Sequence, residues 1–463
     1  MIHRCGLSFF LLACGAFAAV AAPAKDQRTV RAAADRPNII FFLTDDMRWD
    51  SMGCVGNPIV QTPNLDRLAT EGTLFRNCFC TTSICAVSRA SFLTGQYERR
   101  HRIDDFDKPL TPDAFAKTFP ALLRGRGYHT GFVGKYGIGK NLPKDGFDVF
   151  DGFAGQGRYF EPGDPEHITR KMTRKMLAFL DHAPADKPFL LCVSFKAPHC
   201  QDGFKRQFQP DPVYDAIYQD VTIPPPATAT EEAFAALPPF LRHSENRTRW
   251  HVRFATEEAY QSSAKNYYRL VTGVDAAVGK VMAQLRASGA DQRTVVIFTS
   301  DNGFFLGEHG LAGKWLMYEQ SIRLPLLIRD PSIPDTQRGR QVDAMALTID
   351  IAPTILDLAG LQPEPVMQGQ SLRPWLNGRT VPWRDDFFYE YHFDYRGRIA
   401  PCEGVRGRRF KYIRYLATDP IYESLFDLAE DPNELRDLGR NPEYQDVLMK
   451  MRARWQELAK EAE

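Results

Sequence analysis

The stretch "NIIFFLTDD", residues 38–46, joins a continuous apolar run to two adjacent acids. An unbroken apolar run of this length is typical of a strand buried on both faces, as in parallel sheets. In open sheets of this kind, ligands bind at the carboxyl ends of the strands. The stretch therefore predicts a fully buried strand that is followed by Asp45 and Asp46, beside a functional site.

Two further apolar runs also end in polar pairs. They are "KPFLLCVSFKAPH" at residues 187–199 and "RTVVIFTSDNG" at residues 293–303, and residues 323–331 add a fourth apolar strand. Helical patterns at residues 62–72 and 257–289 alternate with these strands. The alternation predicts an α/β fold, with a large mixed, mostly parallel sheet flanked by helices on both faces.

After about residue 370 the pattern changes to short, partly alternating strands, such as "DFFYEYHFDY" at residues 386–395. A final helical pattern follows at residues 443–462. These features predict a smaller C-terminal antiparallel sheet plus a helix. We expect a large domain at residues 36–370 and an α+β subdomain at residues 371–463.

The first 24 residues have a short basic start, an apolar run and then small residues. This pattern predicts a secretory signal peptide at residues 1–22 and an exported protein, in a periplasmic, secreted or lysosome-like location. Lipoprotein anchoring at Cys14 is the less favoured alternative, because Leu12 fits a lipoprotein cleavage box poorly. Nothing later in the sequence is long and apolar enough to predict a membrane span.

The chain of 463 residues has a formal net charge of +1, with 25% charged and 44% hydrophobic residues. This balance does not favour nucleic-acid or membrane-surface binding, so any preference for anions must be local. Seven of the nine cysteines follow the predicted signal peptide. Because seven is odd, at least one thiol stays unpaired, either as an idle buried group or for chemistry.

Four oxygen-bearing side chains at strand ends suggest a metal site: Asp45, Asp46, Asp301 and Asn302. Adjacent acids repel, and a cation between them relieves the repulsion. Oxygen donors without histidine favour Ca²⁺, ahead of Mg²⁺ or Mn²⁺. The alternative is that each pair is only a helix cap or a turn, and for one pair alone we prefer that reading.

"TTSICAVSRASFLTGQY", residues 81–97, places Cys85 at the start of a helix-like segment. The unpaired N–H groups and the dipole at a helix N-terminus attract anions, so we expect a lowered thiol pKa. Arg89, one turn later, is expected to point at the same spot. A packed or disulfide-bonded cysteine is the alternative, and it is the commoner role of an isolated cysteine.

The motifs resemble, in content and order, those of the type I, formylglycine-dependent sulfatases of the alkaline-phosphatase-like superfamily. The resemblance runs from Arg36 to "YESLFDLAEDPNELRDL" at residues 422–438 and rests most on "CAVSRASFLTG" at residues 85–95. The other matching residues are Asp45, Asp46, Gly134, Lys135, Pro198, His199, Asp301, Asn302 and Lys314. The resemblance implies an enzyme that hydrolyses sulfate esters.

The resemblance also implies a role for each matching residue. Cys85 would be oxidised by a formylglycine-generating maturation enzyme, and the aldehyde hydrate would attack sulfur. The cation would be held by Asp45, Asp46, Cys85, Asp301 and Asn302. Arg89 would orient the nucleophile, Lys135 and Lys314 would neutralise sulfate oxygens, and His199 would bind sulfate or protonate the leaving alcohol.

Two positions depart from the family pattern. Val87 stands where a proline is usual, within the motif that the maturation enzyme reads; because Ser88 and Arg89 are retained, we still expect conversion of Cys85. Gly137, in "GKYGIG", stands where a histidine is common near the nucleophile. We expect another group, such as His309 or a substrate hydroxyl, to take over the role of that histidine.

A sulfated carbohydrate or glycosaminoglycan is the expected substrate. The Pro-rich stretch at residues 222–240, which we expect to be an insertion near the site, and the C-terminal region resemble glucosamine-6-sulfatase-like members. A basic segment at residues 396–414 gives weak support for a polyanionic substrate, although each residue alone reads better as a solvated sheet edge. The segment contains Arg396, Arg398, Arg406, Arg408, Arg409, Lys411 and Arg414. The alternative functions are a phosphate or phosphonate monoester hydrolase on the same fold and a non-catalytic glycan-binding descendant.

Overall fold

A computed structural model of the chain describes residues 1–2, 36–393 and 395–463. The described residues from Arg36 onward belong to one compact unit. Apart from Met1 and Ile2, the predicted signal peptide at residues 1–22, with Cys14, lies outside the described residues. The predicted domain boundary near residue 370 stays a prediction.

An eight-stranded sheet forms the centre of the molecule, in the order β12-β2-β11-β7-β1-β6-β4-β5. Five neighbouring strands, from β7 to β5, run parallel, while β11 runs antiparallel to both β7 and β2. The sheet is therefore mixed and mostly parallel, as predicted. The strands are β1 (Asn38–Asp45), β2 (Thr73–Phe75), β4 (His129–Lys135), β5 (Val149–Phe153), β6 (Phe189–Pro198), β7 (Thr294–Ser300), β11 (Leu326–Arg329) and β12 (Arg340–Val342).

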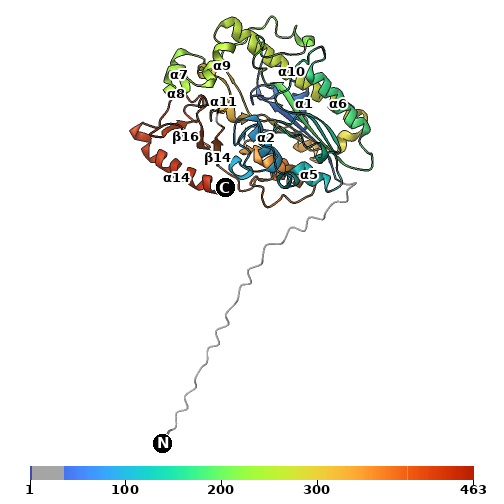
Figure 1. Cartoon of the computed structure of the whole chain (residues 1–463). Helices are drawn as coiled ribbons and strands as arrows, with labels where there is room; N and C mark the ends of the chain where they lie inside the picture. Colours follow the sequence, from blue (N-terminus) through green and yellow to red (C-terminus); the bar gives the residue numbers. More distant parts are fainter. Residues whose placement is uncertain (3–35, 394) are drawn as a thin grey trace. The chain divides into compact units, whose positions relative to one another are not determined.

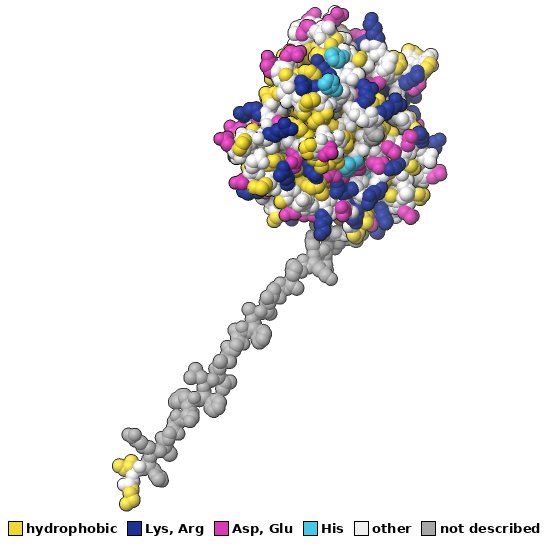
Figure 2. Space-filling view, turned by 60° about the vertical axis from the view of Figure 1, so that its left-hand side comes forward, with side chains coloured by type: hydrophobic (Ala, Val, Ile, Leu, Met, Phe, Trp, Pro, Cys, Tyr) yellow, Lys and Arg dark blue, Asp and Glu magenta, His cyan; other side chains and the backbone are white. Residues whose placement is uncertain are grey.

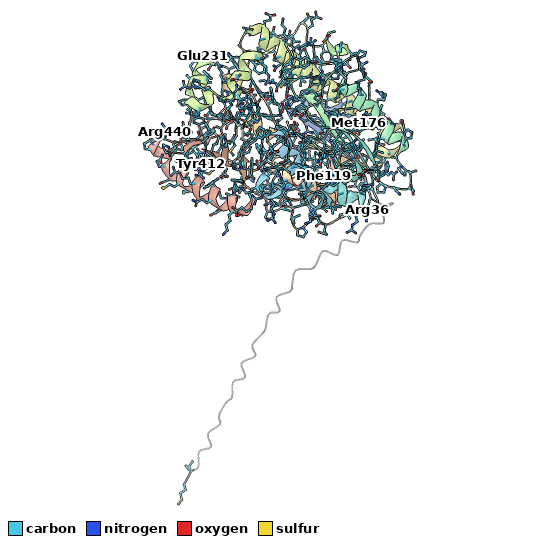
Figure 3. All side chains as sticks on the ribbon, viewed as in Figure 1. Arg36, Phe119, Met176, Glu231, Tyr412 and Arg440 are labelled. Atoms are coloured by element: carbon cyan, nitrogen blue, oxygen red, sulfur yellow. The ribbon has the colours of Figure 1, made fainter. Side chains whose placement is uncertain are left out.

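Strand β1 is buried on both faces, which explains its unbroken apolar run. Ile39, Phe41 and Leu43 belong to one hydrophobic cluster, and Ile40 and Phe42 belong to a second one. Since successive side chains of a strand point to opposite faces, the two clusters lie on the two sides of the sheet. The labelled Phe119 belongs to the first cluster and Met176 to the second (Figure 3).

Helices cover both faces of this sheet (Figure 1). On the Phe42 side lie α1 (Pro63–Glu71), α6 (Ile168–His182) and the long α10 (Glu257–Ala287). On the Phe41 side lie α2 (Cys85–Thr94), α5 (Phe119–Arg124) and α12 (Ile351–Leu358). The predicted helices at residues 62–72 and 257–289 are confirmed to within two residues.

The C-terminal region forms a four-stranded antiparallel sheet, as predicted from its alternating pattern. Helix α14 (Gln445–Glu461) packs on it through Leu448 and Leu458, against Tyr412 and Val405 of the sheet (Figures 1 and 3). Its strands are β14 (Asp386–Tyr391), β15 (Cys402–Gly407), β16 (Phe410–Tyr415) and β17 (Tyr422–Asp427).

Short elements connect these layers. The helices are α3 (Glu98–His101), α4 (Pro112–Ala116), α7 (Glu231–Ala236), α8 (Pro239–Arg242), α9 (Glu245–Arg253), α11 (Glu319–Ile322) and α13 (Arg373–Leu376). The strands are β3 (Cys78–Phe79), β8 (Phe305–Leu306), β9 (Ala312–Gly313), β10 (Arg323–Leu324) and β13 (Ala346–Leu347).

The side of the molecule shown in Figure 2 carries no face of a single charge. Basic and acidic side chains are interspersed on the side shown in Figure 2, in keeping with the net charge of +1. None of the helices formed by the described residues is both long and apolar enough to cross a bilayer.

The aromatic packing of β1 makes a direct test of this core. Phe41 lies 5.6 Å from the ring of Phe92 and 5.9 Å from that of Phe119. We expect Phe41→Ala to lower the free energy of unfolding by about 3–5 kcal/mol, because it leaves a cavity in a packed interior. Urea titration measures the change. Met449→Ala, at an exposed position of α14, is the control and should stay within about 0.5 kcal/mol of the parent. Equal losses in the two variants would contradict the packing described here.

Candidate active centre

The sequence-predicted site residues come together where the parallel strands end. Asp45 closes β1, Lys135 closes β4, and His199 and Asp301 follow β6 and β7 directly. Helix α2 begins at Cys85 and points its first turn at the same place. Lys314 reaches the centre from the loop after β9. Nine predicted residues are buried there: Asp45, Asp46, Cys85, Arg89, Lys135, His199, Asp301, Asn302 and Lys314.

Asp45 is the acid around which the cations gather. Its carboxylate accepts a hydrogen bond from Lys135 Nζ at 2.5 Å and lies 3.3 Å from Arg89 Nη2. Burial alone would raise the pKa of Asp45, but the charges of Lys135, Arg89 and Lys314 hold it well below its usual range. Asp45 is therefore ionised, and the site offers a fixed negative charge at its floor.

Asp46 adopts a left-handed backbone conformation, with φ of 68°. One oxygen accepts hydrogen bonds from Lys314 Nζ and Asn302 Nδ2, both at 2.5 Å. Burial and the nearby Asp45 raise the pKa of Asp46 to about 6, although Lys314 opposes the shift. Burial would lower the pKa of Lys314, but Asp46 and its other anionic neighbours raise it well above the usual value. Lys314 is therefore a permanent cation at this centre.

Arg89 ties helix α2 to the end of β7. Its Nε and Nη2 donate to Asp301 Oδ2 at 3.0 and 2.8 Å, and its Nη1 donates to the backbone oxygen of Lys135 at 2.8 Å. The preceding Ser88 hydroxyl donates to the Asp301 carbonyl at 2.5 Å. The retained Ser88-Arg89 pair thus fixes the position of Cys85 relative to the acids.

Cys85 contacts both an acidic and a basic side chain of the centre. Its thiol donates to Asp45 Oδ1 at 3.2 Å and accepts from Lys314 Nζ at 2.7 Å. The prediction of a lowered thiol pKa is wrong: burial, reinforced by the Asp45 charge, raises the pKa of Cys85 to about 12 despite Lys135 and Lys314. The helix N-terminus does not outweigh the loss of water, so the unmodified thiol stays protonated.

The acids around Cys85 fit a divalent cation. Ligand atoms of Asp45, Asp46, Cys85 and His199 all lie within 4.8 Å of one another. Two buried oxygens, Asp46 Oδ2 and Asn302 Oδ1, have no hydrogen-bond partner among the described residues. Orphaned oxygens on a carboxylate and an amide are the donors that hard cations take. The residues present therefore suit such an ion, and His199 joins the predicted ligands Asp45, Asp46 and Cys85 in this cluster.

The two histidines considered from the sequence have different fates. His199 lies at the centre, with Nε2 3.6 Å from Asp46 Oδ2 and Nδ1 against the Cys200 carbonyl. Burial holds the pKa of His199 well below its usual value, so its ring is neutral. His309 instead packs on Tyr318, with ring centroids 5.1 Å apart, and does not line the Cys85 cavity. The proposal that His309 replaces the missing histidine is wrong.

Gly137, which stands where the family often has a histidine, lies against the side chain of Arg89. A Cβ atom at Gly137 would lie only 2.8 Å from Arg89 Cδ, and the residue has a φ of 75°. The space that a side chain would need is filled by the stem of Arg89. The departure at residue 137 is therefore coupled to the position of Arg89.

Sequence reasoning missed two further residues of the centre. Gln156 lines the Cys85 cavity and accepts from Lys135 Nζ at 2.6 Å, but its irregular segment gave no signal. Lys196 is buried, and its Nζ lies 4.9 Å from the Tyr159 ring without a hydrogen-bond partner among the described residues. A lysine in the otherwise apolar run "FLLCVSFKAP" was a signal that could have found it.

The basic segment is largely neutralised by neighbouring acids, which favours its reading as a structural edge. Arg398 pairs with Glu245, Arg408 with Asp385 and Arg409 with Asp427. Arg406 and Lys411 share Glu319, and Lys411 also contacts Glu434.

The seven cysteines of the described residues are all free thiols, and none of them forms a disulfide.

Comparisons with known proteins agree on one family. A sequence profile described as Sulfatase matches residues 37–361, and one described as N-sulphoglucosamine sulphohydrolase, C-terminal, matches residues 307–461. The chain is 30% identical over 501 residues to an N-acetylglucosamine-6-O-sulfatase of Bacteroides thetaiotaomicron, covering 94% of this chain and 87% of the relative. It is 25% identical to the N-acetylglucosamine-6-sulfatase of Homo sapiens, covering 89% of this chain and 82% of the relative.

A solved structure gives the same picture in three dimensions. It holds a protein in complex with its substrate, D-glucosamine-2-N,6-O-disulfate, and superposes with a TM-score of 0.79 at 28% identity. The match covers 92% of this chain and 98% of the other.

The crowding at Gly137 can be tested against a second glycine of the same backbone type. We expect Gly137→Ala to be less stable than Gly56→Ala by about 1–3 kcal/mol, the cost of overpacking. Gly56 also has a positive φ, 95°, but a Cβ there meets nothing within 4 Å, so it carries only the backbone penalty. Urea titration of both variants gives the comparison. Equal stabilities would mean that residue 137 and Arg89 are not coupled.

Proposed function

Because this chain belongs to the sulfatase family and is a sulfuric ester hydrolase, we propose that it removes the 6-O-sulfate of glucosamine units in sulfated glycans. The substrate choice is supported by the two relatives that are named as 6-sulfatases of N-acetylglucosamine. It is also supported by the solved neighbour, whose substrate is a 2-N,6-O-disulfated glucosamine. The resemblance read from the motifs is confirmed at the level of the family.

The observation that carries the chemistry is the set of cations around Cys85. Lys314 Nζ contacts the thiol at 2.7 Å, and Lys135 Nζ donates to the Asp45 carboxylate, which the thiol also contacts. A sulfate ester placed on residue 85 therefore meets two ammonium groups that can neutralise its oxygens, as in phosphoryl transfer. His199, held neutral by burial, can accept or pass a proton at Nε2.

We infer that Cys85 is a precursor. As an unmodified thiol it is protonated and hence a weak nucleophile. Conversion to formylglycine by a maturation enzyme would supply a nucleophile that does not depend on a thiolate. Val87 is fully buried in the core below this turn, so conversion of Cys85 is expected before α2 packs into the sheet.

We propose Ca²⁺ as the resident cation, held by Asp45, Asp46, Asp301 and Asn302 together with residue 85. The ion would polarise a sulfate oxygen and lower the pKa of the attacking hydroxyl. Lys135, Lys314 and Arg89 form ion pairs with these acids. With a cation bound to the carboxylates, their charges would be available to sulfate.

We also propose that the chain is exported after cleavage near residue 22. The proposal rests on the amino-terminal pattern alone. It agrees with a sulfated glycan as the substrate, because such polymers are encountered outside the cytosol.

Replacing Cys85 tests the proposed chemistry. We expect Cys85→Ala to abolish release of sulfate from glucosamine-6-sulfate, since no nucleophile remains, while the fold persists. Cys54→Ala is the matched control: Cys54 is half-buried, lies outside the centre and should leave turnover unchanged. Mass spectrometry of the Cys85 peptide from the native host should show formylglycine. Faster hydrolysis of phosphate than of sulfate esters would instead favour the phosphatase alternative, and an unmodified, inactive protein would favour the glycan-binding one.

Calcium binding can be measured without turnover. We expect Ca²⁺ at 100 times its Kd to stabilise the protein by about 2.7 kcal/mol, seen as a rise in Tm by calorimetry. Asp46→Asn should remove most of that rise, because Asp46 carries the orphaned oxygen. Asp50→Asn, an acid of the same loop that pairs with Arg48, is the control and should keep the rise. A calcium response that survives Asp46→Asn would take Asp46 off the ligand set.

A further inference from the structure

Two adjoining cavities lie outside the Cys85 centre and meet at Trp49 and Arg323. Their volumes are about 500 and 400 Å³, within the range of small-molecule sites. None of their lining residues belongs to the cavity over Cys85. We call the two together the Trp49 cleft. It is formed by the loop after β1, by α11 and β10, and by residues of β15 and its turn.

The cleft has more positive than negative charge on its walls. Five arginines and three acids line it, and all three acids are already engaged. Asp50 and Glu308 both pair with Arg48, and Glu319 pairs with Arg406 and Lys411. The arginines are Arg48, Arg76, Arg323, Arg406 and Arg408.

Arg323 is an arginine of the cleft that can still bind an anion. Its guanidinium stacks 3.8 Å from the centre of the Trp49 ring. Nε and Nη2 donate to the Arg76 carbonyl, and Nη2 also reaches Asn77. No carboxylate of the described residues lies within ion-pair distance of it. An anionic group entering the cleft therefore meets an unpaired charge that is held flat by an aromatic ring.

Two polar atoms of residues that line the cleft have no hydrogen-bond partner among the described residues, and a ligand could supply one. Thr228 is only 3% exposed, and its Oγ1 has no partner among the described residues. The buried Oε1 of Gln320 also lacks a partner among them. An amide oxygen can only accept, so the missing partner of Gln320 must be a donor such as a hydroxyl. A ligand that satisfies the cleft thus carries both hydroxyl groups and a negative charge.

We propose that the Trp49 cleft binds an anionic saccharide unit, a second unit of the glycan chain, at a site separate from the Cys85 cavity. The acidic group pairs with Arg323, hydroxyls bond to Gln320 and Thr228, and the ring packs beside Trp49. The choice of a sulfated glycan rests on the proposed function; the anion and hydroxyl requirements do not.

One hydrogen bond links a residue of the cleft to a residue of the catalytic cavity. Arg48, which lines the cleft, donates through Nη1 to the carbonyl of Phe304 at 3.0 Å, and Phe304 lines the Cys85 cavity. Arg48 also follows Asp46 by two residues. A chain that occupies both sites gains from holding two units at once, so the protein should bind oligosaccharides more tightly than single sugars.

The test compares binding and turnover. Binding of a heparin-derived octasaccharide is measured by calorimetry in the Cys85→Ala protein, which cannot consume it. We expect Arg323→Ala to weaken this binding about tenfold, the usual loss for one charge-assisted contact. Thr228→Val and Gln320→Met remove atoms that bond nothing among the described residues, so they should fold normally and also weaken binding. Arg67→Ala, at an exposed arginine of α1 outside the cleft, is the control.

Each outcome either supports or overturns the proposed saccharide site. An octasaccharide affinity that is unchanged in Arg323→Ala, or reduced equally in Arg67→Ala, overturns the proposal, as does equal binding of a fully desulfated, carboxyl-reduced octasaccharide. With Cys85 intact, Arg323→Ala should hydrolyse glucosamine-6-sulfate at the parent rate. If the parent itself fails on that sugar, the proposed function is wrong, whereas the binding measurements still judge the cleft.

Discussion

Three buried carboxylates and three buried cations share the ends of four strands and the first turn of α2, and the rest of the centre depends on their balance. Asp45, Asp46 and Asp301 face Lys135, Lys314 and Arg89 across contacts of 2.5–3.3 Å. Unpaired, any of these charges would be costly to bury. Together they hold Cys85 in a fixed place, with a cation on one side and an acid on the other.

The parallel sheet makes this balance possible. Strands β1, β4, β6 and β7 run side by side in the same direction, so their carboxyl ends lie at one edge. Asp46 and Asn302, which are separated by 256 residues in the chain, thereby come within hydrogen-bond distance. Apolar packing on both faces keeps the strands in register, and Arg89 then locks the helix to the sheet.

Patterns within a short stretch of sequence predicted the architecture well. The apolar runs at β1, β6 and β7 and the helices α1 and α10 were readable because burial on both faces and amphipathic periodicity leave a local imprint. The candidate residues at strand ends were likewise readable, and the family resemblance joined them into one site. Short elements such as β3, β8 and β9 were not predicted, because two-residue strands carry no pattern of their own.

Other properties could not be read locally. The pKa of Cys85 rises because Asp45 and the surrounding protein exclude water, although the helix start alone suggested the opposite. The basic segment at residues 396–414 looks like a polyanion site until its acids, many from distant elements, are seen beside it. Gln156 and the Trp49 cleft emerge only when separate loops are brought together.

The sequence by itself determined the strand and helix order, the acids at the strand ends and the cysteine at the start of α2, since these depend on neighbouring residues in the chain. Only the tertiary structure decided which charges neutralise each other, why Gly137 replaces a larger residue and where His309 lies. Those outcomes depend on distances between segments far apart in sequence and on the exclusion of water between them, which the order of residues does not record.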